Sequence, residues 1–566
     1  MLRIMTCGGK ILALLVAIGA GGLAAPAQSN AIPRPGTVVN TREGPVRGEL
    51  RNGVLTFLGI PYAAPPVGML RWKPPAPPRR HGLIDATRQP NMCPQSNTLG
   101  VFAGPTSITE DCLYLSIYTT GTGSAGGKLK PVIFWIHGGG NFDGSGSDYD
   151  GSRLARGGPN GVPAVVVTLN YRLGLLGFNA HPALRRPGEP FANYGILDQQ
   201  AALRWLKANA AAFGGDPNRI AVGGQSGGSV DTHAHVVSPL SAGLINRAIF
   251  MSAPNAFFVP LQAAEARARA FAAAAGCPGS DAAAAQCLRQ LLVPRILQLQ
   301  GTLRENGPFI DNTNVILDGT ILAMQPAEAY AAGKFNQVPV LGGTTADELT
   351  FSKSFELYYM PREQREKGVV PGKMMGFMSN DQYVAGIKGR FGPKADKVLA
   401  EYPASKFGDD AGLASFRVTN DPIQCSATLR VMKILAARVA AYAYVFTYPD
   451  APYPYPKMPG FRALAAHTID IQFLFTGYHG GQLGVNLDQV TGMPRGLNAG
   501  EEKLSDQLTG FWTRFADTGN PNGPGSNVWP RAKPDAVTIL QQDIPLATWT
   551  EAQARERYHC AFWESL

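Results

Sequence analysis

Apolar residues gather in short runs along the chain, and segments with helical spacing lie between these runs. Residues 131–136 and 164–169 are β-type runs, and the second is nearly continuous in apolar residues, so we expect it to be buried on both faces. Between positions 193 and 212 apolar residues recur at helical spacing on one face: Leu197, Ala201, Trp205 and Leu206. A further strand is expected at 220–222. The alternation predicts an α/β fold with a mostly parallel central sheet flanked by helices.

The two ends of the chain continue this pattern. Short strands are predicted within 45–62, and the proline-rich stretch 61–78 is expected to be an ordered loop, because prolines cannot donate to a strand ladder. Further strands are predicted at 338–341, 441–447 and 537–541. Residues 350–435 have a mainly helical pattern and are expected to extend over the strand ends and cover a site there. A last helix is predicted at 504–516, with this buried face: Leu508, Phe511, Trp512 and Phe515.

Composition supports one large core. The 566 residues are 45% apolar and 16% charged, and glycine and proline are spread along the chain rather than gathered in a linker. Residues 28–566 are therefore predicted to form a single domain. The formal net charge of +10 becomes +8 without Arg3 and Lys10. Since no dense Lys/Arg stripe with interleaved aromatic residues occurs, we expect no nucleic-acid partner.

The first residues have the pattern of an export signal. Arg3 and Lys10 are positive, positions 11–24 are apolar, and Ala25-Pro26-Ala27 offers a cleavage site with small residues. The apolar run is too short and too rich in glycine for a stable membrane anchor. Residues 1–27 are therefore predicted to be a signal peptide of a secreted or periplasmic protein. The alternative is a buried first helix.

Six cysteines follow this segment: Cys93, Cys112, Cys277, Cys287, Cys425 and Cys560. An even number in an exported chain predicts three disulfides, for which 15 pairings are possible. Close spacing favours Cys93–Cys112 and Cys277–Cys287, which leaves Cys425–Cys560. The alternative is free thiols in a reducing compartment. No CxxC pair occurs, which argues against a redox or zinc site.

The most informative short segment is Gly224-Gln225-Ser226-Gly227-Gly228, which follows the apolar run 220–222 and precedes a helical pattern. A strand, a sharp turn and a helix present the serine hydroxyl clear of the backbone, and glycines two residues before and two after it let the turn close. Ser226 is therefore predicted to be a nucleophile. The alternative is a glycine-rich loop with an incidental serine, since the chain contains 66 glycines.

A serine nucleophile needs an imidazole base and a carboxylate that orients this base. Three histidines follow Ser226 at a useful distance: His467, His479 and His559. His467 lies at the start of an apolar segment and is the first candidate, while His479 lies in a turn and is the second. His559 adjoins Cys560 and is expected to be structural. The acid should lie just past the strand at 338–341, where spacing leaves both Asp347 and Glu348 open; a solvated acidic turn is the alternative.

The segment His137-Gly138-Gly139-Gly140 directly follows the strand at 131–136. Glycines in this place leave backbone N–H groups free to bind an oxyanion, whereas the alternative is a flexible turn. His233 and His235 could suggest a metal site. However, residues two apart on a helix do not share a face, so core or surface roles are expected for both and no metal is predicted.

At this point the chain resembles the type-B carboxylesterase/cholinesterase family of α/β-hydrolases, from about residue 41 to its C-terminus. Several separate motifs carry the resemblance: Gly59-Ile60-Pro61-Tyr62-Ala63, Pro65-Pro66-Val67-Gly68, Glu110-Asp111-Cys112-Leu113-Tyr114-Leu115, the glycine loop, Asn170-Tyr171-Arg172, Phe213-Gly214-Gly215-Asp216-Pro217, the serine turn, Phe511-Trp512 and Gly519-Asn520-Pro521. The resemblance implies an α/β-hydrolase fold whose helical excursions cover the active site.

The resemblance also implies a role for each matching residue. It implies Ser226 as nucleophile, Glu348 as acid and His467 as base. The implied oxyanion donors are the N–H groups of Gly139, Gly140 and Gly227. Ser252 matches a serine that supports the site from behind, and the implied disulfides agree with the pairs favoured by spacing. No cofactor and no metal are implied.

Several positions depart from the family pattern. Gln225 and Gly227 stand where the family usually has Glu and Ala, Leu349 replaces the usual glycine after the acid, and Asn141 replaces an aromatic residue. Glycine at 227 keeps the N–H group. The segment between Cys93 and Cys112 has no tryptophan, which in choline-ester enzymes holds the cation. Together with Gln225, this argues against a quaternary-ammonium substrate.

The expected function is that of a serine carboxylic-ester hydrolase, which cleaves uncharged small-molecule esters through an acyl-enzyme. One alternative is a hydrolase that prefers amides, carbamates or lactones. Another is a non-catalytic cholinesterase-like binding protein; such proteins typically lack a member of the triad, whereas all three positions are filled here. The pattern specifies neither the natural ester nor the oligomeric state.

Overall fold

The computed structural model describes residues 37–123, 127–253, 256–305, 315–366, 369–370, 372–524 and 528–566. The predicted signal peptide at 1–27 lies outside the described residues. Among the helices of the described part, none is long and apolar enough to cross a membrane.

Within the described residues, one eleven-stranded sheet organises the fold, with strand order β16-β15-β14-β13-β10-β9-β7-β8-β6-β4-β3. Its strands are β3 (Glu49–Arg51), β4 (Val54–Pro61), β6 (Tyr114–Thr119), β7 (Lys130–Ile136), β8 (Val165–Leu169), β9 (Gly215–Gln225), β10 (Arg247–Met251), β13 (Val340–Thr345), β14 (Ala441–Phe446), β15 (Ile539–Gln542) and β16 (Ala547–Trp549). Smaller sheets pair β1 (Val38–Asn40), β2 (Pro45–Arg47) and β5 (Ile84–Asp85), and β11 (Val259–Pro260) with β12 (Ile316–Leu317).

The strands from β8 to β15 in this order run parallel, and antiparallel pairs occur at both edges of the sheet. The mostly parallel sheet predicted from the sequence is thus confirmed, and all five residues of β8 are buried. Sequence analysis did not predict β6 or β10. The apolar run in β10 is only four residues long, which is too short to separate a strand from a helix by periodicity.

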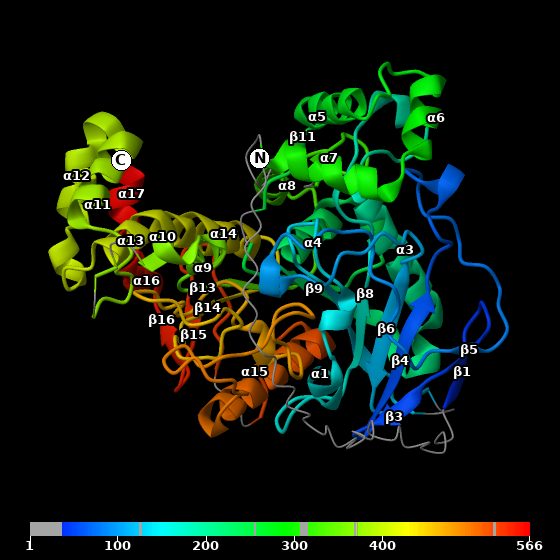
Figure 1. The fold of residues 1–566 in the computed structure, drawn as a ribbon. Coiled ribbons are helices and arrows are strands. Elements are labelled where there is room, and N and C mark those ends of the chain that lie inside the picture. The colour runs from blue at the N-terminus through cyan, green and yellow to red at the C-terminus, as the bar shows by residue number, and fades with distance from the viewer. Residues whose placement is uncertain are drawn as a thin grey trace, which may run out of the picture. The chain divides into compact units, whose positions relative to one another are not determined.

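Helices cover both faces of this sheet (Figure 1). One side carries α1 (Ser152–Arg156) and α15 (Ala499–Thr518), while the other carries α3 (Tyr194–Asn209), α4 (Gly227–Val237) and α8 (Pro326–Ala332). The remaining helices are α2 (Gly174–Gly177), α5 (Leu261–Ala274), α6 (Ala282–Gln290), α7 (Val293–Glu305), α9 (Thr350–Tyr359), α10 (Arg362–Glu366), α11 (Asn380–Phe391), α12 (Ala395–Glu401), α13 (Ala411–Gln424), α14 (Val431–Ala436), α16 (Glu551–Arg557) and α17 (Cys560–Ser565).

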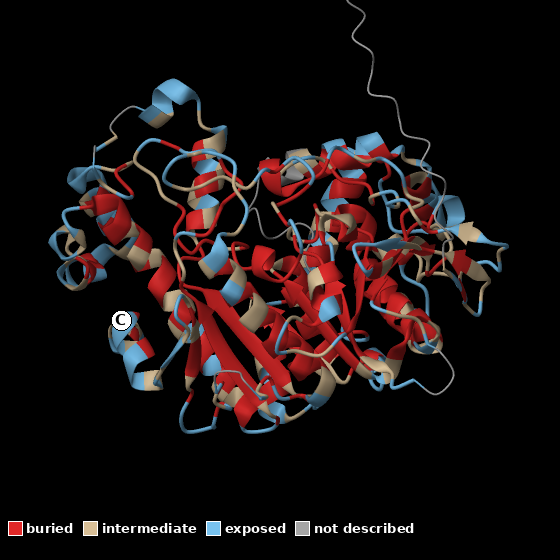
Figure 2. Ribbon diagram, turned by 90° about the horizontal axis from the view of Figure 1, so that it is seen from below, coloured by how far each residue is buried: buried red, intermediate tan, exposed pale blue. Residues whose placement is uncertain are grey.

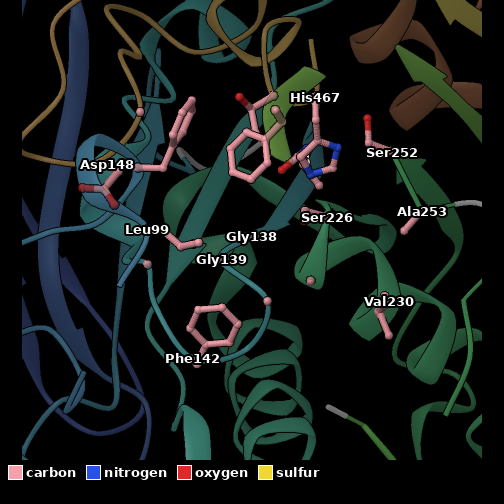
Figure 3. Close-up of a pocket in the computed structure, with 18 of the residues that line it drawn as sticks. Leu99, Gly138, Gly139, Phe142, Asp148, Ser226, Val230, Ser252, Ala253 and His467 are labelled. Carbon is pink, nitrogen blue, oxygen red and sulfur yellow. Dashed lines mark hydrogen bonds between the residues drawn. The ribbon is translucent and has the colours of Figure 1, made fainter. Parts of the chain in front are cut away.

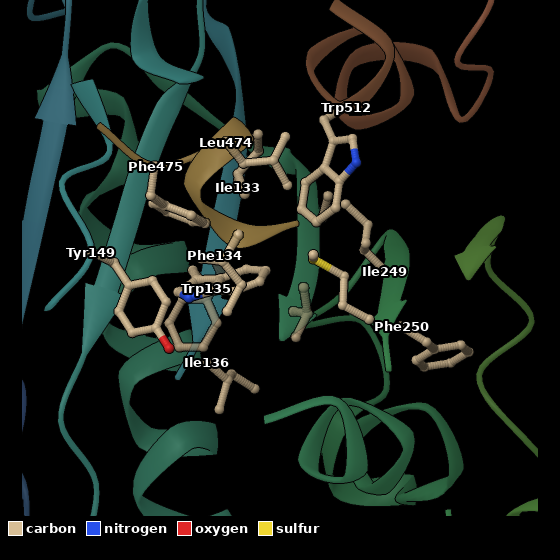
Figure 4. Packing of buried hydrophobic residues seen from close by; sticks show 14 of the residues in the cluster. Ile133, Phe134, Trp135, Ile136, Tyr149, Ile249, Phe250, Leu474, Phe475 and Trp512 are labelled. Atoms are coloured by element: carbon tan, nitrogen blue, oxygen red, sulfur yellow. The ribbon is translucent and has the colours of Figure 1, made fainter. Parts of the chain in front are cut away.

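The core lies along the central strands, which Figure 2 shows as continuously buried. Trp135 on β7 is fully buried, and its ring centroid lies 4.7 Å from that of Phe475 and 5.9 Å from that of Trp512 on α15 (Figure 4). Each such buried aromatic side chain contributes roughly 2–3 kcal/mol by leaving water. Because β7 leads directly into the glycine loop, this packing fixes the strand end from which the loop departs.

Helix α15 confirms the predicted C-terminal helix and extends it at both ends. The Asn498 side chain accepts from the Glu501 amide, and the Glu501 side chain accepts from the Asn498 amide, so a capping box starts the helix before position 504. Gly519 ends it with φ of +79°, a left-handed conformation that glycine adopts without strain.

The helical pattern at 350–435 is confirmed by the six helices α9 to α14. A second group, α5 to α7, was not predicted from the alanine-rich stretch at 262–285. Its residues Phe271, Leu288 and Ile296 are fully buried in a second apolar cluster, which also includes residues of α2 and α3. The alanines there leave few large side chains to mark a buried face, which explains why the pattern gave a weak signal.

The three disulfides form as predicted, between Cys93 and Cys112, Cys277 and Cys287, and Cys425 and Cys560. The first closes the loop beside the glycine segment, and the second joins the end of α5 to α6. The third links positions 135 residues apart, and so ties α13 to the C-terminal helix α17.

Candidate active site

Ser226 lies in the sharp turn between β9 and α4. Its backbone has φ of +56° and ψ of −122°, a conformation that an L-residue adopts only under strain. The Ser226 amide donates to the Met251 carbonyl of the neighbouring strand at 2.9 Å, which holds the turn against the sheet. The strand, turn and helix predicted from the sequence are therefore present, and the serine stands at the apex.

The glycines on both sides of Ser226 are required by space. A Cβ atom at Gly224 would lie 2.3 Å from the Gly228 carbonyl oxygen, and one at Gly228 would lie 2.1 Å from the Ile136 carbonyl oxygen. Any side chain at either position would therefore force the turn open. This is the physical reason for small residues two before and two after the serine.

Two loops from neighbouring strands bring an acid and a base together. Glu348 follows β13 and His467 follows β14, and the two chain segments meet in a bridge between Asp347 and Ala466. The His467 Nδ1–H group donates to Glu348 Oε2. The carboxyl ends of parallel strands meet at one edge of a sheet, so residues 119 positions apart become neighbours.

The environment of Glu348 keeps it ionised. Burial opposes its charge, but the neighbouring His467 ring and the Thr345 amide together hold the pKa of Glu348 below its usual value. The Thr345 amide donates to Glu348 Oε1 at 2.8 Å. Ser252 follows β10 with φ of +55° and lines the same cavity as Ser226, and its supporting role stays a prediction.

Asp347, the other acid left open by spacing, points elsewhere. Its carboxylate accepts from the Ala465 amide at 3.1 Å and pairs with Arg417 at 3.0 Å. The structure therefore brings Glu348, and not Asp347, to His467. The Leu349 backbone has φ of −80°, which leucine adopts without strain, so this position does not need a glycine.

Gln225 makes the remaining hydrogen bond of the His467 ring. Its Nε2 atom lies 3.0 Å from His467 Nε2. Since Nδ1 carries the proton that faces Glu348, Nε2 of the neutral ring accepts this bond from the amide. Sequence analysis noted Gln225 as a lost negative charge but did not predict this contact.

The other candidate histidines lie apart from this pair. His479 Nδ1 is 3.1 Å from the Gly481 carbonyl oxygen, and His559 contacts Glu401. His233 and His235 are fully buried and bonded to protein groups, and burial lowers the pKa of each to about 3. In the described part of the chain, no group of three or more His, Cys, Asp or Glu side chains is arranged to hold a metal ion.

The glycine loop follows β7 and faces the start of α4. Gly139 and Gly140 have φ of +102° and +60°, and a Cβ atom on Gly139 would lie 2.0 Å from the Asp143 carbonyl oxygen. A Cβ atom on Gly227 would lie 2.9 Å from the Gly140 nitrogen. The glycine loop therefore lies against Gly227, the residue that directly follows Ser226.

A cavity of about 260 Å³ opens over these groups (Figure 3). Ser226, Gln225, Ser252, His467 and the glycines of the loop line it. Its larger apolar and aromatic lining residues are Leu99, Phe102, Phe142, Tyr149, Val230, Phe351 and Tyr478.

Sequence analysis named none of these larger lining residues, although Phe142 follows the glycine loop and Val230 lies on α4 just after the serine turn. The others come from separate segments that meet only in the folded chain. From the predicted helical cover at 350–435, Phe351 reaches the cavity, and its ring packs edge-on against His467 at a centroid distance of 5.3 Å. The position of Phe351 three residues after Glu348 is the one signal that could have indicated it.

Asp470, three residues after His467, gives a pH-dependent prediction. Burial and the negative charge of Glu348 raise the pKa of Asp470 to about 7, whereas an unfolded aspartate titrates near 4. Between these values the folded protein keeps a proton that the unfolded chain releases, so stability falls as pH rises through this range. Between pH 5 and pH 8, we expect the free energy of unfolding of the wild type to fall on the order of 2 kcal/mol more than that of Asp470→Asn.

Thermal unfolding at both pH values measures this effect. The wild type should lose more Tm between pH 5 and pH 8 than Asp470→Asn does. All other titrating groups are shared by the two proteins, so parallel Tm profiles would contradict the assignment of a raised pKa to Asp470.

Comparison with known proteins gives one consistent result. The carboxylesterase family model matches residues 35–563. A fumonisin B1 esterase of Sphingopyxis macrogoltabida is 34% identical over 533 residues, which cover 93% of this chain and 89% of that protein. An acylcarnitine hydrolase of Mus musculus is 32% identical over 554 residues, covering 94% of this chain and 91% of that protein.

Solved structures agree with the sequence matches. A carboxylesterase of Geobacillus stearothermophilus superposes with a TM-score of 0.72 at 28% identity, covering 93% of this chain and 100% of that one. A PNB esterase superposes with a TM-score of 0.71 at 28% identity, covering 92% and 99%. With a serine turn, a histidine–glutamate pair and a glycine loop at one cavity, this chain belongs to the carboxylesterase family and is a serine ester hydrolase of the α/β-hydrolase fold.

Proposed function

We propose that Ser226, His467 and Glu348 are the catalytic triad of this esterase. The observation that carries the proposal is one cavity lined at once by Ser226, by the His467 ring bonded to Glu348, and by the glycine loop. Ser226 Oγ attacks the ester carbonyl carbon while His467 Nε2 takes its proton. The imidazolium then returns this proton to the leaving alcohol, and Glu348 stabilises its charge.

The backbone N–H groups of Gly139, Gly140 and Gly227 are the proposed oxyanion hole. They stabilise the negative charge that develops on the carbonyl oxygen in both the acylation and the deacylation step. In deacylation, a water molecule gives its proton to His467 and attacks the acyl-enzyme, which releases the acid and restores Ser226. No step requires a cofactor or a metal.

Before His467 can accept the serine proton, its Nε2 atom has to exchange the Gln225 amide for the Ser226 hydroxyl. Both the Ser226 hydroxyl and the His467 ring line the same cavity, and in the proposed mechanism the ring turns its Nε2 atom from Gln225 to Ser226. Hydrogen bonds of catalytic groups in a free enzyme are often loose and tighten when substrate binds. Gln225 is accordingly a resting partner of the base in the proposed mechanism.

The proposed substrates are small uncharged esters with an apolar acyl or alcohol part. The lining consists mainly of apolar and aromatic side chains, and contains no Lys or Arg. Leu99 and Phe102, from the segment between Cys93 and Cys112, occupy the wall where choline-ester enzymes carry a tryptophan. The lining also contains the carboxyl of Asp148, whose pKa burial raises to about 7, so the argument against a quaternary-ammonium ester rests on the absent tryptophan and on Gln225. A series of matched esters, amides, carbamates and lactones tests the preference for esters.

We place this activity outside the cytoplasm, in a secreted or periplasmic protein. The signal pattern at 1–27 predicts cleavage after Ala27, which leaves a catalytic domain at 28–566. The three disulfides support a secreted or periplasmic protein, because such bonds persist in oxidising compartments. Sequencing the N-terminus of the exported protein tests the cleavage site.

Hydrolysis of p-nitrophenyl esters of increasing acyl length, combined with a fluorophosphonate probe, tests the function. We expect one probe molecule per chain, loss of ester hydrolysis in proportion to labelling, and the label on the peptide that contains Ser226. Labelling of a different residue would contradict the triad. A protein that neither hydrolyses these esters nor reacts with the probe would instead fit the non-catalytic binding protein.

Gln225→Glu tests the contact with the base. The new carboxylate would lie beside His467 Nε2 and stabilise the protonated ring by its negative charge. In the wild type, the NH2 group of Gln225 loses its hydrogen bond when Nε2 of the ring is protonated. We expect the acidic limb of the kcat/KM profile to move upward by roughly one pH unit, because more alkali is then needed to free the base. Superimposable profiles for the two proteins would contradict the contact.

A further inference from the structure

Two residues at which this chain departs from the family pattern, Asn141 and Gly227, lie against each other. A Cβ atom on Gly227 would lie 2.9 Å from the Gly140 nitrogen and 3.0 Å from the Asn141 nitrogen. The first distance is shorter than real Cβ contacts, the second is tighter than most of them, and both atoms are backbone atoms that cannot rotate away. The glycine loop thus lies too close to the first turn of α4 for the alanine that the family usually carries there.

A buried hydrogen bond holds the loop in this position. Asn141 Nδ2 donates to Asp231 Oδ1 at 2.9 Å, and both side chains are fully buried. Asp231 lies four residues after Gly227 on α4, so it stands on the same face of the helix one turn further on. Figure 3 shows Gly139 and Phe142 of the loop beside the helix that carries Val230.

The partners of this bond are themselves fixed. Gln199 on α3 donates its Nε2 hydrogen to Asp231 Oδ2 at 2.6 Å. The Tyr171 hydroxyl donates to Asn141 Oδ1 at 3.1 Å, and the Gly174 amide donates to the Asn141 carbonyl at 2.6 Å. Asn141 has φ of +62°, a left-handed conformation that asparagine tolerates better than most residues with a side chain.

We propose that Asn141 and Asp231 are positioning residues that clamp the oxyanion loop onto α4, and that Gly227 is the glycine which this close approach requires. The inference rests on the proposed roles of Gly139, Gly140 and Gly227 as oxyanion donors. An oxyanion hole acts only when its donors lie about 2.7–3.1 Å from the developing charge. The clamp fixes the distance between the two donors on the loop and the donor on the helix.

Asn141→Ala, Asp231→Ala and Asp231→Asn test the clamp by steady-state kinetics on an aryl ester. We expect the two alanine variants to lower kcat by about 10- to 100-fold with KM changed less than about threefold, because the loss falls on the transition state. Asp231→Asn keeps an oxygen for Asn141 but turns its NH2 group toward the Gln199 donor, so its kcat should lie above that of Asp231→Ala and below that of the wild type. Alanine variants with kcat within twofold of the wild type would overturn the proposal.

A second buried Asn–Asp pair provides the matched control. Asn193 Nδ2 donates to Asp318 Oδ2 at 2.6 Å, and neither residue lines the cavity. Asn193→Ala should lower Tm as Asn141→Ala does, yet leave kcat unchanged. If Asn193→Ala lost as much kcat as Asn141→Ala, the effect at Asn141 would be general destabilisation, and the proposal would be wrong.

Gly227→Ala provides a test that does not depend on a buried polar group. In the wild-type background we expect it to lower kcat by about 100-fold, since the new methyl group pushes the loop away. In the Asn141→Ala background the loop is free to move, so the same change should cost less than about tenfold. Independent, multiplicative effects would overturn the proposal.

These results are separable from failure of the proposed function. A wild-type protein without ester hydrolysis or labelling of Ser226 would overturn the triad itself. In an active wild-type protein, the variants at 141, 227 and 231 test the clamp alone.

Discussion

Ser226→Ala is expected to lower kcat for an aryl ester about 10⁶-fold, because it removes the hydroxyl that forms the acyl-enzyme in the proposed mechanism. The residual rate should remain above that of water, since the glycine loop still polarises a bound carbonyl group. Alanine at this position has the same strained φ as the serine, so the fold should be retained. Initial rates on the purified variant, with fluorophosphonate labelling to exclude contaminating wild type, measure the effect.

Ser229→Ala is the matched control for this experiment. Ser229 lies in the first turn of α4, three residues after Ser226, and is fully buried. Among the described residues its hydroxyl has no hydrogen-bond partner, so its removal should leave kcat within about twofold. Retained activity in Ser226→Ala, or an equal loss in Ser229→Ala, would remove Ser226 from the mechanism.

The nucleophile turn was the part of the site easiest to predict from the sequence. The requirement for Gly224 is mainly local, since its nearest contact is the Gly228 carbonyl, whereas Gly228 lies against the Ile136 carbonyl of the neighbouring strand. The oxyanion loop is similar, because glycine at 139 and 140 is demanded by atoms of residues 142 and 143. Features whose physical cause lies within a few residues leave a short motif, and such motifs can be identified without a structure.

The partner of the base could not be derived in this way. Asp347 and Glu348 are adjacent and equally acidic, and only the pairing of Asp347 with Arg417 and of Glu348 with His467 separates them. These partners are 70 and 119 residues away from the two acids. Spacing alone therefore left the choice open, and resemblance to the family supplied the answer that the geometry supports.

The residues of the cavity wall and the hydrogen bond from Gln225 to His467 could not be predicted from the sequence for the same reason. Phe102, Tyr149, Phe351 and Tyr478 come from four separate segments, and each is an ordinary aromatic residue in its own segment. They become a wall only after the sheet has brought the loops together. Substrate preference thus depends on long-range packing, whereas the chemistry depends largely on local turns.

Glu348→Gln is expected to lower kcat by about 10⁴-fold with little change in KM. The carboxylate fixes the His467 tautomer with its proton on Nδ1 and balances the charge that the ring acquires in the transition state. A neutral amide can instead donate to Nδ1, which moves the ring proton to Nε2 and removes the acceptor for the serine proton. The loss should therefore appear in kcat and in the rate of fluorophosphonate labelling alike.

Asp347→Asn separates this role from the general effect of removing a buried acid next to it. Asp347 is as buried as Glu348, but its partners are Arg417 and the Ala465 amide, and it does not touch the His467 ring. We expect Asp347→Asn to lower Tm, because Arg417 loses the nearer of its two carboxylate partners, and to keep kcat within about threefold. If instead Asp347→Asn abolished activity while Glu348→Gln retained it, the acid would have to be reassigned. The loss of charge beside the imidazole, rather than the loss of a carboxylate from this loop, is what we expect to stop catalysis.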